Sequence, residues 1–472
     1  MRVLLLAMPD VASSFDRVMR IPNLGLASLA ANVKNADVRI LDLVAHSRHV
    51  GSAVRRALAD LRPQLVGLSA MTFQYDTAKQ VAAIVREAAP EARTVLGGYH
   101  ATLAYQEIAS DPGAHVFDFL VRGEGEEPLN RLVQSLAAGE GLPGIPGLSY
   151  RHGGSFIHNA PSSLLDLDRL RLPAREARLS SGFHYFGRRF DAVETSRGCT
   201  RSCRFCSIRH MYGHGYRAFP IPRVIDDIRA AAAAGAEGVF FVDDNINLQP
   251  GRLRQLCHAI ADAGLNHLEY ISQADVAGFA REPDLPAAMQ RAGFSGIFLG
   301  IESVDETNWR FLHKANSLAR TQEVIRGLRS HGISVAGGLI VGNPDEDATA
   351  IRAAFRTART LEMDHAIMWC LTPYPGTEIR GDLTADGLVV NAGDYRSYNG
   401  FICNVRTRHL SHHQLVRLIA TEGLKLYFHP KFVFRSRVWG RRRGSALAYL
   451  QCSLEYLTRA YRNRLYASRH RM

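Results

Sequence analysis

Residues 192–206 read AVETSRGCTRSCRFC, a short apolar run that leads directly into a loop with three cysteines. Cys199, Cys203 and Cys206 have the spacing C-x3-C-x2-C, and Ala192–Ser196 before them has a strand pattern. Three thiolates on one tight loop can each bind one iron of a cubane cluster, which leaves the fourth iron open to an external ligand. The stretch therefore predicts a [4Fe–4S] site at the carboxyl end of a strand.

The spacing alone leaves two other interpretations open, a zinc site or buried structural cysteines. Zinc takes a fourth ligand from Cys or His, and His210 lies near enough in sequence to supply it. We expect no cluster ligand among the other cysteines, which are scattered along the chain: Cys257, Cys370, Cys403 and Cys452. The odd total of seven cysteines argues against the disulfide framework of a secreted protein.

The cysteine loop belongs to the first of six predicted βα repeats. The strand candidates are Ala192–Ser196, Gly238–Asp243, His267–Ser272, Gly296–Ile301, Val335–Val341 and Ala366–Leu371. Helical patterns lie between them at Val224–Ala234, Leu253–Ala263, Leu285–Ala292 and Thr321–His331. Six such repeats predict a partial (β/α)6 barrel over residues 189–380, with catalytic groups at the carboxyl ends of its strands.

The polar motifs at these strand ends resemble those of the radical S-adenosylmethionine superfamily. The resemblance covers about residues 190–380 and includes an aromatic residue, Phe205, before the last cysteine. The other matching motifs are Asp243-Asp244-Asn245, Gln273, Gly300-Ile301-Glu302-Ser303, the stretch from Gly338 to Glu346, and the stretch from Thr372 to Thr377. The stretch that ends at Glu346 is similar to the family pattern G-x-I-x-G-x-x-E, with one additional residue before the Glu.

The resemblance implies that Cys199, Cys203 and Cys206 are catalytic and hold a [4Fe–4S] cluster. It implies that S-adenosylmethionine contacts Phe205, Asp243, Asp244, Gln273, Glu302, Gly338 and Ile340; Phe205 would pack against the adenine or only within its own loop. In this family the reduced cluster cleaves S-adenosylmethionine, and the 5′-deoxyadenosyl radical removes hydrogen from an unactivated carbon. Such chemistry needs an electron donor such as flavodoxin or ferredoxin.

Residues 1–138 show a second alternation of strands and helices. The strand candidates are Val3–Ala7, Val38–Leu43, Leu65–Ala70, Thr94–Gly97 and Phe117–Val121, and the helical patterns are Gly25–Lys34, Val54–Leu61 and Thr77–Ala88. This α/β pattern predicts a doubly wound, Rossmann-like parallel sheet. Ligands of such sheets bind at the carboxyl ends of the strands, so the expected ligand-facing loops are Pro9–Asn23, Ser69–Tyr75, Gly97–His100 and Arg122–Glu126.

Several phrases in these loops resemble the cobalamin-binding domain that precedes some radical S-adenosylmethionine cores. They are Pro22 to Leu26, Gly67 to Thr72, Gly97 to Thr102 and Arg122 to Glu126, and they imply cobalamin contacts from Ser69, Thr72, Gly97, Gly98, His100 and Glu124. The D-x-H-x-x-G motif of many cobalamin proteins is absent, because Asp42 and His46 are four residues apart without the matching glycine. Two alternatives stay open: a degenerate domain without cofactor, or glycines that only turn the chain.

Residues 139–188 are rich in Gly and Pro and read as a linker with a small hairpin near residues 147–158, and residues 381–472 as a mostly helical, basic C-terminal region. Residues 401–472 carry 15 Lys and Arg against 2 Asp and Glu, so the net charge of +12 lies in this tail. An amphipathic stripe from Leu447 to Leu465, with Phe432, Phe434, Trp439 and the run Arg441 to Arg443, is typical of contact with a membrane surface. A helix packed on the barrel is the alternative, and nucleic acid is not expected.

No run of eighteen apolar residues is present, and Val3–Ala7 is too short for a signal peptide. We therefore expect a cytoplasmic enzyme, with peripheral membrane contact through its tail. The resemblance favours methylation of an unactivated carbon in a lipid or natural-product intermediate. Radical cyclisation or rearrangement on the same scaffold and a non-catalytic cobalamin or iron–sulfur sensor are the alternatives. A methylthiotransferase is not expected, because that class needs three further cysteines and none precedes Cys199.

Overall fold

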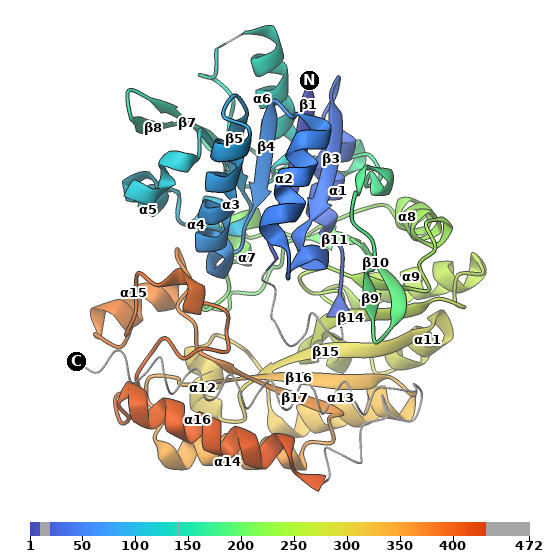
Figure 1. Cartoon of the computed structure of the whole chain (residues 1–472). Coiled ribbons are helices and arrows are strands. Elements are labelled where there is room, and N and C mark those ends of the chain that lie inside the picture. Colours follow the sequence, from blue (N-terminus) through green and yellow to red (C-terminus); the bar gives the residue numbers. More distant parts are fainter. Residues whose placement is uncertain (10–18, 140, 431–472) are drawn as a thin grey trace.

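The computed structural model describes residues 1–9, 19–139 and 141–430. Two α/β parts lie one above the other in Figure 1, an N-terminal sheet at the top and a curved second sheet below it. The predicted fold class, a doubly wound sheet followed by a partial barrel, is confirmed.

Five strands of the N-terminal sheet are parallel and lie side by side in the order β3-β1-β4-β5-β6, with β3 at one edge. They are β1 (Arg2–Ala7), β3 (Asp37–Asp42), β4 (Leu65–Ser69), β5 (Arg93–Gly97) and β6 (Phe119–Val121). Because helices cover both faces, the strands are apolar on both sides: Leu4 and Leu6 pack into one core, and Val3 and Leu5 into another. The strand order reverses between β1 and β4, which places the topological switch point at their carboxyl ends.

The helices of this part lie in two layers. One core joins the sheet to α2 (Val50–Leu61) and α3 (Tyr75–Ala88), and the other joins it to α1 (Leu24–Asn32) and α6 (Glu126–Ala138). Short helices α4 (Tyr99–Leu103) and α5 (Tyr105–Ser110) follow β5. Helix α1 begins at Leu24, one residue before its predicted start, because the Asn23 side chain caps it by accepting a hydrogen bond from the Leu26 amide at 3.0 Å.

The hairpin predicted within residues 139–188 is present as β7 (Leu148–His152) and β8 (Ser155–His158). It does not stand alone, because β7 pairs antiparallel with β6 and extends the N-terminal sheet to seven strands. The burial of Leu148 and Tyr150 in the core between the sheet and α6 explains this pairing. Farther along, the Leu179 amide donates to the Ile40 carbonyl at the opposite edge of the sheet at 2.8 Å.

The second sheet contains six parallel strands in chain order, as a partial barrel requires. They are β10 (Arg188–Val193), β13 (Gly238–Phe241), β14 (Glu269–Asp275), β15 (Phe294–Glu302), β16 (Ser334–Val341) and β17 (His365–Cys370). Helices α8 (Ile221–Ala233), α9 (Pro250–Asp262), α11 (Leu285–Ala292), α13 (Leu318–Ser330) and α14 (Ala348–Thr360) pack on its outer face. Two short antiparallel strands, β9 (His184–Tyr185) and β2 (Met19–Arg20), extend its β10 edge.

The first barrel strand ends earlier than the sequence predicts. Strand β10 stops at Val193, and Ser196–Arg197 forms a separate strand, β11, paired with β12 (Arg217–Ala218). The cause is the carboxylate of Asp243, which accepts hydrogen bonds from the Thr195 amide at 3.0 Å and the Thr195 hydroxyl at 2.6 Å. These bonds turn the chain away from the sheet just before the cysteines.

The described part of the C-terminal region contains α15 (Glu378–Ala385), an irregular segment, and α16 (His412–Tyr427), which packs on α14. Ser411 begins α16 with a capping box to Gln414. The predicted amphipathic stripe and its flanking aromatic and basic residues lie outside the described residues. Among the described helices, none has the length and apolarity that a membrane span needs.

Candidate functional site

The three cysteines line one small cavity at the carboxyl ends of the barrel strands. The cavity has a volume of about 160 Å³, and Phe205, Asp244, Gln273, Glu302 and Lys314 share its lining. Four of the residues predicted to contact S-adenosylmethionine thus lie beside the cysteines. Phe205 belongs to the cysteine loop, Asp244 follows β13, and Gln273 and Glu302 belong to β14 and β15. His210, the residue that kept a zinc site open, is not among the lining residues.

The geometry of the cysteine loop depends on Gly198. This residue has φ of +85°, and a Cβ there would collide with the carbonyl oxygen of Gly215. Burial raises the pKa of all three thiols, that of Cys206 to about 12. Thiolates are the ligand form that iron requires, so metal loading would displace protons from the three thiols that line this cavity. The donor set and its shared cavity fit a cubane cluster with one open iron.

Asp243 and Asp244 point in different directions. The Asp243 carboxylate is buried beneath β11, where it accepts from Thr195 and Ser196, and it lines neither cavity described here. The Asp244 carboxylate accepts a bond from the Gly198 amide at 3.0 Å and faces the cysteine cavity. Burial raises the pKa of Asp244 to about 6. Because Asp244 lines the cavity and Asp243 does not, Asp244 is the one of the two aspartates that is placed to meet a cationic ligand.

Two further predicted residues are held in place by specific bonds. The Gln273 side chain donates to the Asp243 carbonyl at 2.9 Å. Glu302 has an unusual φ of +67° and forms an ion pair of 3.0 Å with Lys314. Backbone strain of this kind costs about 1–3 kcal/mol and is found most often at functional sites.

The structure does not bring Gly338 and Ile340 into the cysteine cavity. Both residues belong to β16, one strand farther along the sheet than Glu302. A Cβ at Gly338 would lie 2.6 Å from Cζ of Phe298, a residue that does line the cavity. Gly338 therefore acts by leaving room for that ring.

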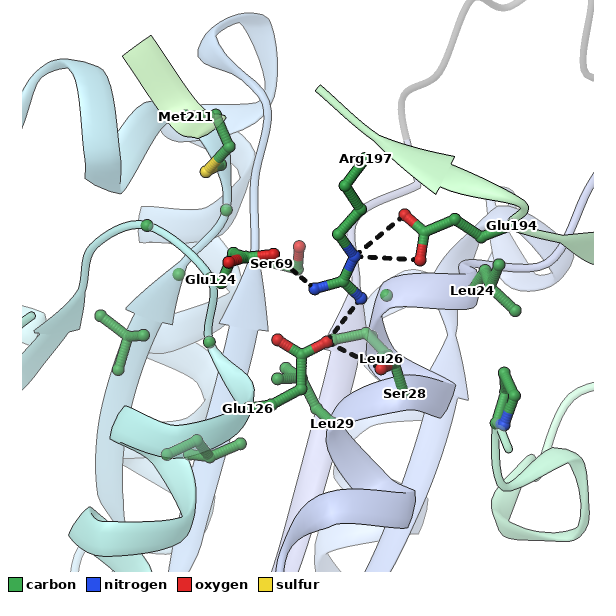
Figure 2. A pocket seen from close by; sticks show the side chains of 18 of the residues that line it. Leu24, Leu26, Ser28, Leu29, Ser69, Glu124, Glu126, Glu194, Arg197 and Met211 are labelled. Atoms are coloured by element: carbon green, nitrogen blue, oxygen red, sulfur yellow. Dashed lines mark hydrogen bonds and ion pairs between the residues drawn. The ribbon is translucent and has the colours of Figure 1, made fainter. Parts of the chain in front are cut away.

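A second, larger cavity of about 300 Å³ lies between the N-terminal sheet and the barrel (Figure 2). Ser69, Gly97, Gly98 and Glu124, all predicted to contact cobalamin, line it. Its walls combine leucines of α1 with glycines within β4 and at the end of β5. Gly98 has φ of +89°, and a Cβ there would lie 2.9 Å from the Ala70 carbonyl oxygen. This mixture of apolar wall and open backbone fits a large ligand rich in amides.

Thr72 and His100 are buried and do not line this cavity. The His100 ring turns instead toward Tyr75 and Tyr395, with ring centroids 4.4 Å and 4.8 Å away. Burial lowers the pKa of His100 to about 3, and neither ring nitrogen has a hydrogen-bond partner among the described residues. The expected contacts of these two residues with cobalamin therefore find no support in the geometry.

A buried ionic network that the sequence reading missed lies at the centre of Figure 2. Arg197 pairs with Glu124 at 2.8 Å, with Glu126 at 2.7 Å and with Glu194 at 3.0 Å. Burial raises the pKa of Glu194 to about 7. One part of the sequence indicates this network, the phrase Arg122-Gly123-Glu124-Gly125-Glu126. Its two carboxylates need a cation when they are buried, but the sequence does not identify Arg197 as that cation.

The two α/β parts match two protein-family models. Residues 16–133 match the B12 binding domain, and residues 193–358 match the radical SAM superfamily. An uncharacterized methyltransferase of Pyrococcus horikoshii is 28% identical over 437 residues, which are 92% of this chain and 94% of the relative. A hopanoid C-3 methylase of Methylococcus capsulatus is 29% identical over 379 residues, 76% of this chain and 68% of the relative.

Another relative has a different reaction in its name. An anaerobic magnesium-protoporphyrin IX monomethyl ester cyclase of Cereibacter sphaeroides is 26% identical over 423 residues, 88% of this chain and 67% of the relative. Among solved structures, the radical S-adenosylmethionine methyltransferase TsrM of Kitasatospora setae, with cobalamin and a [4Fe–4S] cluster bound, shares the fold. Its TM-score is 0.72 at 17% identity, with 98% of this chain and 99% of TsrM covered.

These matches confirm that the chain is an enzyme and that it uses a [4Fe–4S] cluster, S-adenosylmethionine and cobalamin. The chain belongs to the radical S-adenosylmethionine superfamily, among the members with an N-terminal B12-binding domain.

Proposed function

We propose that this enzyme transfers a methyl group to an unactivated carbon of a lipid or natural-product intermediate. The observation that carries the proposal is that Asp244 lines both cavities, the one with the three cysteines and the one between the two parts. Ligands of the two cavities would therefore meet at one place. Such an arrangement suits a reaction in which a methyl group and a radical centre act on the same substrate carbon.

We assign the cluster to Cys199, Cys203 and Cys206. S-adenosylmethionine would contact Phe205, Asp244, Gln273 and Glu302, which line the same cavity. In the larger cavity, cobalamin would contact Ser69, Gly97, Gly98 and Glu124. We assign no direct contact to Asp243, Gly338, Ile340, Thr72 or His100, because none of them lines either cavity.

When bound, the cluster and S-adenosylmethionine supply a 5′-deoxyadenosyl radical, and cobalamin supplies the methyl group. The residues of this chain bind and orient these groups. The carboxylate of Asp244 offers a negative charge to the amino group or the sulfonium of S-adenosylmethionine. The charge of Lys314 is balanced by Glu302. Burial alone would lower the pKa of the lysine, but the neighbouring Glu302 and Cys203 outweigh burial and raise the pKa above its ordinary value, so the lysine stays cationic. Such a cation suits a ligand carboxylate.

The cyclase relative favours a second candidate, radical ring formation on the same scaffold. Product analysis separates the two reactions. Methylation that regenerates the methyl donor from S-adenosylmethionine yields S-adenosylhomocysteine together with 5′-deoxyadenosine, whereas cyclisation yields no S-adenosylhomocysteine. A one-electron donor such as flavodoxin and a peripheral membrane contact through the basic tail complete the proposal.

The test is an anaerobic turnover experiment with reconstituted enzyme, hydroxocobalamin, a chemical reductant and a panel of isoprenoid and hopanoid acceptors. The proposal predicts equal amounts of S-adenosylhomocysteine and methylated product, with 5′-deoxyadenosine in the same proportion. Radical cleavage with an altered acceptor but without S-adenosylhomocysteine would support cyclisation instead. An Asp244→Asn variant should lose at least tenfold in both nucleoside products, while Asp226→Asn, on the exposed face of α8, should keep them.

A further inference from the structure

Arg197 joins the two cofactor cavities. It is the last residue of β11 and stands two positions before Cys199. Its guanidinium lies in the larger cavity, where it donates to Glu124 and Glu126 of the N-terminal part. Figure 2 shows this side chain between the two carboxylates and Glu194. Arg197 therefore contacts the Glu124–Glu126 loop, which lines the larger cavity. The chain continues from Arg197 directly into the cysteine loop, which lines the smaller cavity.

The contact is buried on both sides. The Arg197 side chain is 6% exposed, that of Glu124 1% and that of Glu126 6%. Salt screens such pairs little, and removal of one partner leaves an uncompensated buried charge. Each carboxylate has a further bond that fixes it: the Ser28 hydroxyl donates to Glu126 at 2.7 Å, and the Leu165 amide donates to Glu124 at 2.8 Å.

The backbone between Arg197 and Cys199 is held in a fixed conformation. Gly198 has φ of +85° and packs so closely on Gly215 that no Cβ fits. Its amide donates to Asp244, which lines both cavities. On the paired strand β12, Arg217 also forms an ion pair with Glu124 at 3.0 Å. A shift of the Glu124–Glu126 loop is therefore transmitted to the first cysteine through short, rigid connections.

We propose that Arg197 is a positioning residue that couples occupancy of the cobalamin cavity to occupancy of the cysteine loop by its cluster. The inference rests on the proposed placement of the two cofactors. Filling one cavity fixes the Glu124–Glu126 loop, which fixes Arg197 and, two residues on, Cys199. Because coupling between two binding sites is reciprocal, a loaded cysteine loop strengthens cobalamin binding by the same factor.

The test measures the affinity of the full-length protein for hydroxocobalamin, by its visible spectrum, with and without the reconstituted cluster. We expect the cluster to tighten binding in the wild type by about tenfold, within the usual range of such couplings. In Arg197→Gln the ratio of the two affinities for hydroxocobalamin, with and without the cluster, should fall to about one. The matched control is Arg223→Gln: Arg223 lines the same cavity, but its side chain donates to the backbone carbonyls of Leu170 and Arg171.

A ratio of one in the wild type, with both cofactors bound, would overturn the coupling and leave the proposed function intact. No uptake of hydroxocobalamin or iron by the wild type would overturn both. If Arg197→Gln does not fold, Glu126→Gln replaces it, because its side-chain oxygen can still accept from Ser28. The ratio should then drop at least twofold, and an unchanged ratio in that variant contradicts the proposal. A purely structural ion pair would lower stability without changing the ratio.

Discussion

Asp243 and Asp244 are adjacent in sequence, but their carboxylates have different roles at this site. Asp243 accepts hydrogen bonds from Thr195 and Ser196 and holds the backbone before the cysteines, whereas Asp244 faces the cavity that the cysteines line. The motif predicts that this strand end contacts S-adenosylmethionine, but it does not indicate which carboxylate turns inward. That choice depends on β11 leaving the sheet, a tertiary effect that a strand pattern cannot contain.

The backbone of Gly98 lines the larger cavity in a conformation that L side chains rarely adopt. In Gly98→Ala the methyl group would lie 2.9 Å from the Ala70 carbonyl, and the left-handed backbone would be strained as well. We expect the free energy of unfolding to fall by about 2 kcal/mol and hydroxocobalamin binding to weaken. Gly381→Ala in α15 is the control, because no atom lies within 4 Å of its Cβ. Equal urea-unfolding curves for the Gly98 variant and wild type would contradict this.

His100 gives a pH-dependent prediction. Its pKa is lowered to about 3 by burial in the folded chain, with Lys79 and Arg380 opposing protonation and Asp111 favouring it. In the unfolded chain the His100 imidazole has a pKa near 6.5 and is protonated below that pH, whereas in the folded chain it stays neutral. The contribution of this difference to the free energy of unfolding is therefore present above about pH 6.5 and is lost as the pH falls below it. From pH 7 to 5 the wild type should lose about 2 kcal/mol more than His100→Phe. Parallel pH profiles in urea unfolding would contradict the assignment.

At the scale of elements, the six barrel strands and the five N-terminal strands follow from the apolar runs and helical spacings of the sequence. Several strand bounds differ from the prediction by two to four residues: β14 ends at Asp275 where Ser272 is expected, and β10 begins at Arg188 where Ala192 is expected. The early end of β10 has a specific cause, because Asp243 binds Thr195 and so replaces a sheet contact there. The hairpin within residues 139–188 was predicted, but its pairing with β6 was not. Pairing between distant segments depends on burial of Leu148 and Tyr150, which local patterns do not specify.

The short strand β11 depends on Asp243 for its position. Asp243→Asn keeps the shape but places an amide group opposite three donors, so one hydrogen bond is lost and the cysteine loop loosens. We expect a loss of about 1–3 kcal/mol in unfolding free energy and a several-fold lower iron content after reconstitution. Asp226→Asn, which removes only an exposed ion pair, should change neither quantity. A normal iron content in Asp243→Asn would refute this role.

At the scale of the whole molecule, residues 159–187 connect the N-terminal sheet to the barrel by specific bonds. The Ala174 amide donates to Ala27 of α1, and next to it Arg175 pairs with Asp191 at 3.1 Å and Asp227 at 2.6 Å. These partners come from β10 and α8, so the segment fixes the position of one part on the other. The Gly and Pro content of this segment predicts only a linker. It does not indicate the bonds to α1, β10 and α8, because those partners are distant in sequence.

Removal of this connection should destabilise the protein strongly. Arg175→Met leaves the buried carboxylate of Asp227 without its paired cation, whereas Asp191 keeps its ion pair with Arg178, and we expect a loss of about 3–5 kcal/mol in unfolding free energy. Arg229→Met breaks only an exposed pair with Asp226 and should cost less than about 1 kcal/mol. Chemical denaturation of the two variants compares them directly. A similar small loss in both would show that the network does not hold the two parts together.

The most direct test of the central claim is 5′-deoxyadenosine formation by the full-length enzyme after anaerobic reconstitution with iron, sulfide and reductant. The account predicts that the wild type cleaves S-adenosylmethionine and that Cys199→Ala, Cys203→Ala and Cys206→Ala each lose at least a hundredfold of this activity. Cys257→Ala, a buried cysteine on α9 outside the cavity, should retain it. Undiminished 5′-deoxyadenosine from the Cys203 variant would contradict the account.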